Sequence, residues 1–111
     1  MLDTGQDLPK GTLDLMILKV LSLEPMHGWG VIKRIQLLSK DVFRVQQGSL
    51  YPALQRLKKK GWIRAEWRVT ENSRRARYYT LTESGWEQLG DSQRSWSAST
   101  AAVGRILEAT A

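Results

Sequence analysis

The chain has 111 residues, of which 41% are hydrophobic and 25% charged, and this composition is typical of one soluble globular domain with a modest core. With no cysteine and a single histidine, it lacks the residues for a disulfide framework or a thiolate metal site, so neither a metal nor another cofactor is expected. No apolar run reaches the roughly 20 residues of a membrane span, and the polar, acidic start is unlike a signal peptide, so we expect a cytoplasmic protein.

Positive charge is concentrated in the middle of the chain. The net charge is +6, and residues 44–82 contain ten basic and two acidic residues, a net charge of +8 that leaves −2 for the rest. A basic middle between slightly acidic ends indicates a polyanionic partner, although a solvated cationic surface would give the same pattern. The ten basic residues are Arg44, Arg56, Lys58, Lys59, Lys60, Arg64, Arg68, Arg74, Arg75 and Arg77.

Two helices are expected before this basic segment. Residues 12–23 are apolar almost all round, so this helix should lie at the centre of the core, with Thr12 as its cap and Pro25 enforcing its end. Residues 29–39 predict a second, amphipathic helix, and His27 before it is interpreted as a helix-start or packing residue. The apolar stripe of this second helix consists of Trp29, Ile32, Ile35 and Leu38.

A third helix is predicted to begin at Gly48 and Ser49 and to end at Gly61. Its leucines recur at helical spacing and form one buried stripe, whereas the opposite side is polar and basic. Pro52 is expected in the first turn, where its missing N–H is not needed. Two helices joined by a short connection follow the helix-turn-helix plan, with this third helix presented outward.

The next segment predicts two strands. Ile63, Ala65, Trp67 and Val69 alternate with polar residues, which is typical of a half-buried strand. A polar loop over residues 70–76, carrying Arg74 and Arg75, leads to a second strand over residues 77–82. Two strands joined by a basic loop directly after the outward helix predict a wing.

The remaining residues predict one long helix over 83–109, with Thr82 or Ser84 as its cap. We therefore expect a mostly α protein with a small β-hairpin: a winged helix-turn-helix DNA-binding domain at 8–82 and a carboxy-terminal dimerisation helix at 83–109. As an alternative, part of the apolar stripe of this helix, especially Trp86 and Leu89, is expected to pack on the core of the same chain rather than on a second copy. The expected dimer-interface residues are Trp86, Leu89, Gln93, Trp96, Thr100, Val103 and Leu107.

These residue types suit double-stranded DNA. One helix fits the major groove, where glutamine and serine side chains can read base edges, and lysine and arginine contact phosphates. Tyr51 can reach a phosphate, a sugar or a thymine methyl group, and the wing arginines can follow the phosphates or enter a narrow minor groove. The residues expected to contact DNA are Gln46, Gln47, Ser49, Tyr51, Pro52, Gln55, Arg56, Lys59, Lys60, Arg74 and Arg75.

The chain also resembles the PadR family of bacterial transcriptional regulators, in particular its short members with a single carboxy-terminal helix. The resemblance spans roughly residues 8–89 and is most specific at the Gly-Ser-Leu-Tyr-Pro-Ala-Leu element of residues 48–54. It departs from the family at Trp29, where tyrosine is common, and in the wing loop, where many members have a glycine-proline turn. The matching stretches are Lys10–Asp14, Met26–Gly30, Gly48–Leu54 and Asn72–Thr82.

The resemblance implies a winged helix-turn-helix that dimerises through its terminal helix and acts as a repressor relieved by a small effector. The expected function is sequence-specific regulation of transcription by a homodimer on a pseudo-palindromic operator. Trp96, close to the expected twofold axis, is a candidate contact for a flat aromatic effector.

An enzyme is not expected, since the chain has neither paired carboxylates in a plausible pocket nor a glycine-rich phosphate loop. An RNA-binding or protein-binding winged helix is the alternative. RNA recognition depends on exposed aromatic residues, however, and most aromatic residues here fall at expected core positions.

Overall fold

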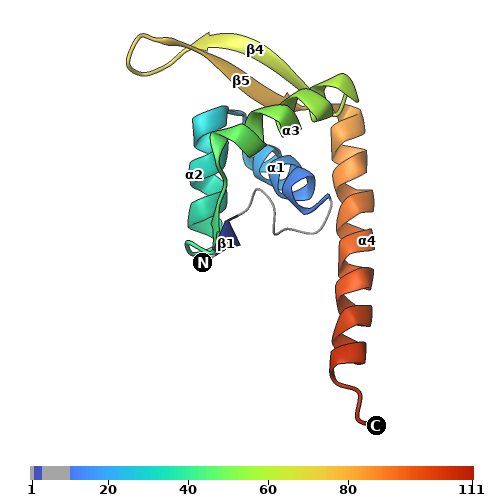
Figure 1. The fold of residues 1–111 in the computed structure, drawn as a ribbon. Coiled ribbons are helices and arrows are strands. Elements are labelled where there is room, and N and C mark those ends of the chain that lie inside the picture. Colours follow the sequence, from blue (N-terminus) through green and yellow to red (C-terminus); the bar gives the residue numbers. More distant parts are fainter. Residues whose placement is uncertain (1, 4–10) are drawn as a thin grey trace.

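The computed structural model describes residues 2–3 and 11–111, and in that part of the chain four helices surround a small core (Figure 1). The fold is mostly helical with small sheets, and the expected fold class is confirmed. None of the helices in the described ranges is long and apolar enough to cross a membrane. The elements are β1 (Leu2–Asp3), α1 (Thr12–Leu23), β2 (Met26–His27), α2 (Gly28–Leu38), β3 (Phe43–Arg44), α3 (Gln47–Lys59), β4 (Ile63–Val69), β5 (Arg75–Leu81) and α4 (Glu83–Leu107).

Helix α1 lies at the centre of the core, as its all-round apolar pattern predicts. Ile17 and Leu18 are almost completely buried, and α1 contacts α2, α3, α4 and β5. The expected cap at Thr12 is wrong: Gly11 caps the helix with a φ of 87°, and Thr12 is the first helical residue. The expected end before Pro25 is confirmed, since Glu24 is the extended residue that terminates α1.

Helix α2 begins one residue earlier than predicted, at Gly28, and its buried stripe is shifted accordingly. Ile32 and Ile35 are buried as expected, together with Gly28 and Val31. Trp29 and Leu38, which the pattern placed on the same stripe, are instead 51% and 57% exposed. Gly28 lies on this stripe and lets the Tyr51 ring of α3 approach closely, whereas Trp29 lies to one side of the stripe and Leu38 is the last residue of the helix.

Helix α3 buries one stripe and exposes the other side. Leu50, Ala53, Leu54 and Leu57 are fully buried against the rest of the core. The helix begins at Gln47 rather than Gly48, so Pro52 is its sixth residue and lies in the second turn. The prediction that Pro52 occupies the first turn is therefore wrong, and the Gly48 carbonyl lacks the helical hydrogen bond that a residue 52 N–H would donate.

Helix α3 ends at Lys59, and Gly61 follows as the left-handed residue that terminates it, as predicted. Gly61 has a φ of 79°, a left-handed conformation that glycine adopts without steric cost. The Trp62 N–H donates to the Leu57 carbonyl at 3.1 Å and the Gly61 N–H to the Lys58 carbonyl at 3.0 Å. These two bonds make a Schellman motif, which turns the chain directly into β4.

The sheet of the wing has three strands, in the order β2-β5-β4, all antiparallel. The sequence predicts the hairpin β4–β5 but not β2, which pairs only Met26 and His27 with Tyr79 and Tyr78. The prediction of a half-buried β4 holds only at its start: Ile63 is buried, whereas Trp67 and Val69 are 54% and 70% exposed. The outer half of the hairpin projects beyond the helices, which therefore cannot cover it (Figure 1).

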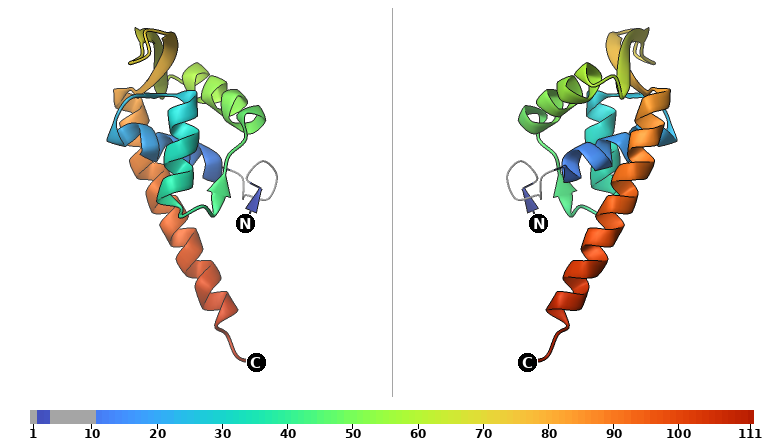
Figure 2. Two further views of the ribbon diagram at one scale, coloured as in Figure 1. Left: turned by 90° about the vertical axis from the view of Figure 1, so that its left-hand side faces the viewer. Right: turned by 90° about the vertical axis from the view of Figure 1, so that its right-hand side faces the viewer.

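Helix α4 is capped by Thr82, whose side chain accepts a hydrogen bond from the Gly85 N–H at 3.1 Å. Its first two turns complete the core through the buried residues Gly85 and Leu89. Beyond them the helix leaves the core and projects away from it (Figure 2), which gives the molecule its extents of 61 × 31 × 21 Å. The helix ends at Leu107, two residues before the predicted end.

We expect Gly85→Ala to lower the free energy of unfolding by about 3 kcal/mol, since a Cβ atom there would lie 2.0 Å from the Trp62 carbonyl oxygen. That oxygen also accepts the Thr82 N–H, so it cannot move away without breaking the start of α4. Gly90→Ala is the control: its Cβ would meet only the flexible Arg94 guanidinium at 3.4 Å, and better helix propensity should stabilise it by up to about 1 kcal/mol. Urea denaturation at one protein concentration measures both, and equal effects would contradict the close approach.

Candidate nucleic-acid interface

The outward side of α3 is polar and cationic. Gly48, Pro52, Gln55 and Lys59 follow one another at helical spacing directly opposite the buried leucine stripe, and all four are exposed. Gln46, Gln47 and Lys60 are also exposed, whereas Ser49 is half-buried. The structure thus gathers most of the expected DNA-contacting residues of this helix on one accessible surface.

Arg56 lies on the edge of this surface that faces α1. Its guanidinium donates to the Asp14 carboxylate at 2.9 Å, an ion pair between α3 and α1. The Asp14 side chain is only 21% exposed, so the pair is partly shielded from solvent. The Arg56 charge is thus already partly neutralised, unlike that of Lys59 and Lys60, which have no carboxylate within 4 Å among the described residues.

Tyr51 lies on the other edge of α3, next to the start of α2. It is 40% exposed, and a Cβ atom at Gly28 would lie 2.7 Å from its hydroxyl oxygen. The absence of a side chain at Gly28 therefore allows the tyrosine ring to lie against the first turn of α2. This contact fixes where the phenol group is presented.

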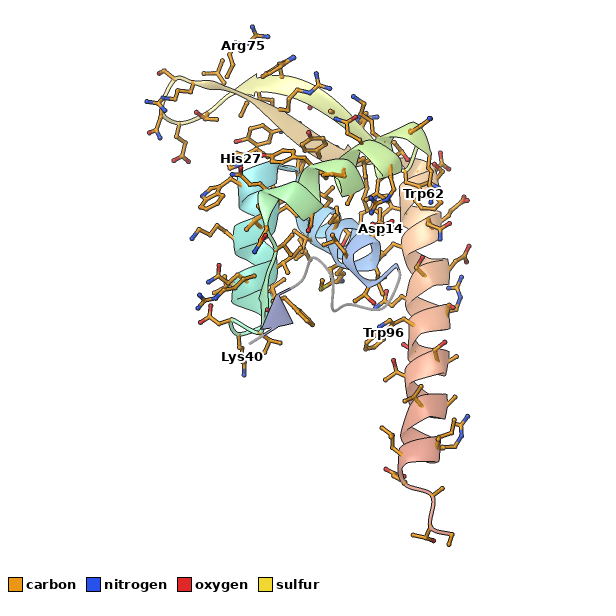
Figure 3. The ribbon with its side chains drawn as sticks, in the orientation of Figure 1. Asp14, His27, Lys40, Trp62, Arg75 and Trp96 are labelled. Carbon is orange, nitrogen blue, oxygen red and sulfur yellow. The ribbon has the colours of Figure 1, made fainter. Side chains whose placement is uncertain are left out.

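His27 caps α2, as the interpretation of a helix-start residue requires. Its Nδ1 accepts the Gly30 N–H at 3.0 Å, and its ring meets the Tyr78 ring edge-on at 5.4 Å between centroids. Figure 3 shows His27 at the start of α2, beside the wing. In the described part of the chain, no group of three or more histidines and carboxylates could hold a metal ion.

The wing loop is shorter than predicted. It covers residues 70–74, closed by a hydrogen bond of 2.7 Å from the Thr70 N–H to the Arg74 carbonyl. Arg74 is in this loop, as expected, but Arg75 is the first residue of β5 and pairs with Val69. The prediction that Arg75 belongs to the loop is therefore wrong. Because Arg75 pairs with Val69 in the sheet, the strand determines the face from which its side chain projects (Figure 3).

The two faces of the hairpin differ in their side chains. Cross-strand partners share a face, so Trp67 lies with Arg77, Val69 with Arg75, and Ala65 with the buried Tyr79. We call this the Trp67 face. The opposite face, which we call the Tyr78 face, carries Arg64, Glu66, Arg68, Ala76, Tyr78 and Thr80.

A groove of about 430 Å³ separates the Trp67 face from the first turns of α2 and α3. Three arginines and four tryptophan or tyrosine side chains border it, and none of its lining residues is acidic. Burial raises the pKa of Tyr79 at its inner end, although the neighbouring Arg77 guanidinium acts in the opposite direction. The principal lining side chains are Trp29, Tyr51, Trp67, Arg74, Arg75 and Arg77.

The sequence did not identify Trp29, Trp67 and Arg77 as residues of this surface. Both tryptophans fall on apolar repeats and were expected in the core. The available signal was the basic residue at every second position of β5, Arg75 and Arg77, which places two positive charges on one strand face.

A second, apolar groove of about 380 Å³ lies between α1, the end of α2, β3 and α4. Trp96 borders it and points from α4 towards α1 (Figure 3), with its side chain 49% exposed. Of the expected pairing stripe, Leu89 is buried in the chain's own core, whereas Trp86 does not pack there and is 54% exposed. Gln93, Thr100, Val103 and Leu107 are all exposed.

Two helices in a helix-turn-helix arrangement, followed by a β-hairpin beside the outward helix, define a winged helix-turn-helix protein. A family model described as the transcriptional regulator PadR-like family matches residues 17–91, more than half of the chain. The chain therefore belongs to the PadR-like family of transcriptional regulators. Members of this family are regulators rather than enzymes, and the prediction that the chain is not an enzyme is therefore confirmed.

Solved structures support this assignment. The chain is similar to a PadR-like transcription factor from Bacteroides fragilis (31% identity, TM-score 0.72, covering 87% of this chain and 91% of that one). A PadR-like transcriptional regulator from Bacillus cereus has 28% identity and a TM-score of 0.78, over 91% and 96% of the two chains. An uncharacterized protein of Lysinibacillus sphaericus is 27% identical over 90 residues, 81% of this chain and 83% of that protein.

Proposed function

We propose that this protein represses transcription as a homodimer bound to a pseudo-palindromic operator in double-stranded DNA. The observation that carries this proposal is the exposed glutamine and lysine surface of α3, continuous with an arginine-bearing groove that no acidic residue lines. In this arrangement α3 enters the major groove and the wing follows the adjacent backbone. Repression is the simplest output, because a protein bound at a promoter excludes polymerase by occupancy alone.

The roles of the residues follow from their positions on this surface. Gln55, opposite the buried stripe, reads base edges together with Gln46 and Gln47. Lys59 and Lys60 contact phosphates at the end of α3. We propose that residues 8–82 form the DNA-binding unit and residues 83–109 the dimerisation helix, with the first turns of that helix completing the core. Binding to chromosomal DNA would place the protein in the cytoplasm.

The dimer is proposed because α4 carries apolar side chains beyond the reach of its own core. Val103, Ile106 and Leu107 are 52%, 72% and 80% exposed. One recognition helix reads only a few base pairs, whereas two related by a twofold axis read half-sites about one helical turn apart. The surface from Trp96 onward, packed against α4 and α1 of a second copy, would bury these side chains, with Gln93 and Thr100 setting the register.

A flat aromatic effector beside Trp96 is a further part of this proposal. The apolar groove next to Trp96 is large enough for such a molecule, and a second copy would bring a second indole near the twofold axis.

Gln55→Ala and Arg74→Ala should weaken DNA binding in different ways. Once a preferred duplex has been selected from random sequences, Gln55→Ala should lose about 1–3 kcal/mol on that duplex and little on a scrambled one, since a base contact is removed. Arg74→Ala should weaken both duplexes by similar factors, because phosphates carry no sequence information. Fluorescence anisotropy measures both losses. If Gln55→Ala weakened binding equally on the two duplexes, α3 would not be the reading helix.

The double substitution Val103→Asp and Leu107→Asp should split the dimer, because it places charge in the proposed contact. Sedimentation should then show a species of 12.7 kDa, and affinity for the selected duplex should fall by orders of magnitude. The control is Ala98→Asp with Ala101→Asp, which adds the same charge on the opposite, exposed side of α4. A dimer that survives the first pair of changes and binds normally would place the pairing surface elsewhere.

Titration with a planar cationic dye should quench the tryptophan fluorescence of the protein in a saturable way. A Trp96→Ala variant should lose the saturable part, since the remaining four of the five tryptophans lie elsewhere. Quenching that is identical in the variant would rule out Trp96 as an effector contact.

A further inference from the structure

The Trp67 face of the wing carries two arginines stacked on one indole ring. The guanidinium carbon of Arg75 lies 4.9 Å from the centre of the Trp67 ring, and that of Arg77 lies 5.3 Å from it. All three side chains share a face, because Trp67 pairs with Arg77, and Arg75 is two residues before Arg77 on β5. We call these three residues the arginine–tryptophan stack.

Core packing does not explain the position of Trp67. Its side chain is 54% exposed and lies closer to the loop of the hairpin than Ile63 and Tyr79, which are the outermost buried residues of the two strands. What the indole contacts instead is positive charge. The negative face of an aromatic ring attracts a guanidinium group, so Trp67 restricts the directions that both arginines can take.

The charges in the stack are not neutralised within the described part of the chain. Arg74, Arg75 and Arg77 form no ion pair there, and no acidic residue lines the groove beside them. On the Tyr78 face, by contrast, Arg68 pairs with Glu66, which leaves Arg64 as the one arginine of that face without an ion pair among the described residues. An anion approaching the wing would therefore be attracted to the Trp67 face.

We propose that the arginine–tryptophan stack binds the phosphate backbone of duplex DNA where it passes between the wing and α3. Arg75 and Arg77 contact the phosphates, and Trp67 is a positioning residue that orders them before DNA arrives. The proposal rests on the DNA-binding function proposed above, and it adds Trp67 and Arg77 to the interface.

The spacing of the two arginines suits this role. Residues two apart on a strand are separated by about 7 Å, so their guanidinium groups reach different phosphates of one DNA strand. An arginine that is already ordered loses less conformational entropy on binding than a free one, so the ring contributes to affinity without touching DNA. Tyr51, fixed against Gly28 on the other side of the groove, borders the same path.

The arginines are tested by the salt dependence of binding to a labelled duplex of mixed sequence, about 20–30 bp long, between about 50 and 200 mM salt. Phosphate contacts do not depend on sequence, so no operator is needed. Each phosphate contact that is lost should make the slope of log affinity against log salt concentration shallower by about 0.9. Arg75→Ala and Arg77→Ala should each reduce the slope in this way for every phosphate that the arginine contacted. Arg64→Ala, with the same loss of charge on the Tyr78 face, should leave the slope unchanged.

Trp67 is tested by whether its effect depends on the arginines. Trp67→Ala should weaken duplex binding about three- to tenfold, and Trp67→Phe, which keeps an aromatic face, should restore most of it. In a double-mutant cycle, Trp67→Ala should cause little further loss of affinity in the variant that already carries Arg75→Ala and Arg77→Ala. When Trp67→Ala is combined with Arg64→Ala instead, the two fold losses of affinity should multiply. Thermal melting checks that each variant folds, and Trp67→Phe still reports on the ring if Trp67→Ala does not fold.

The possible failures are distinguishable. A wild-type slope shallower than about −2, or tighter binding to duplex RNA than to DNA, would overturn the proposed function and this inference with it. A steep wild-type slope that Arg75→Ala and Arg77→Ala do not change would overturn the stack alone. The stack alone would also be overturned if the fold loss of affinity from Trp67→Ala multiplied with the losses from Arg75→Ala and Arg77→Ala.

Discussion

The interaction on which the structure depends is the burial of one stripe of α3 against α1 and α2. Leu50, Leu54 and Leu57 are completely buried, and burying a leucine is worth roughly 1.5–3 kcal/mol. This stripe fixes the rotation of α3 about its own axis, so the polar positions Gln55 and Lys59 must face outward. It also holds the helix together where Pro52 removes a hydrogen bond. The position of the polar, outward surface of α3 is therefore a consequence of core packing.

The ends of the same helix position the two partners of that surface. At its carboxy terminus, the Schellman turn at Gly61 directs the chain into β4, and the Trp62 carbonyl receives the start of α4 through the Thr82 N–H. A single turn thereby connects α3, the wing and α4. Because Gly85 lies against the same carbonyl, the angle at which α4 leaves the core is tied to the position of α3. In the proposed dimer, that angle would set the distance between the two copies of α3.

The inner and outer halves of the wing are stabilised by different interactions. Its inner half is held by the core, but its outer half has no apolar cover, and side-chain interactions on each face take over there. The Tyr78 face has an internal ion pair, and Arg68 lies over the Tyr78 ring at 5.2 Å. On the Trp67 face, Arg75 and Arg77 lie over the Trp67 ring, and neither forms an ion pair in the described part of the chain. Arg75 and Arg77 on the Trp67 face are therefore available to an anion, whereas Arg68 on the Tyr78 face is already paired with Glu66.

Much of this organisation could be predicted from the sequence, because it depends on local periodicity and turn chemistry. The period of the apolar residues predicted α1, α3, the hairpin and α4, while Gly61 and Thr82 marked two boundaries through their own backbone and side-chain preferences. The concentration of positive charge in residues 44–82 and the motif of residues 48–54 indicated a DNA-binding regulator, and the family match confirms this class. Contacts between distant segments were not predictable in this way. A period states which residues share a face, but not where the covering elements end, so Trp29 and Trp67 were expected in the core. The pairing of Arg56 with Asp14, the closeness of Gly28 to Tyr51, and the stacking of two arginines on Trp67 join residues whose proximity arises only once the chain has folded.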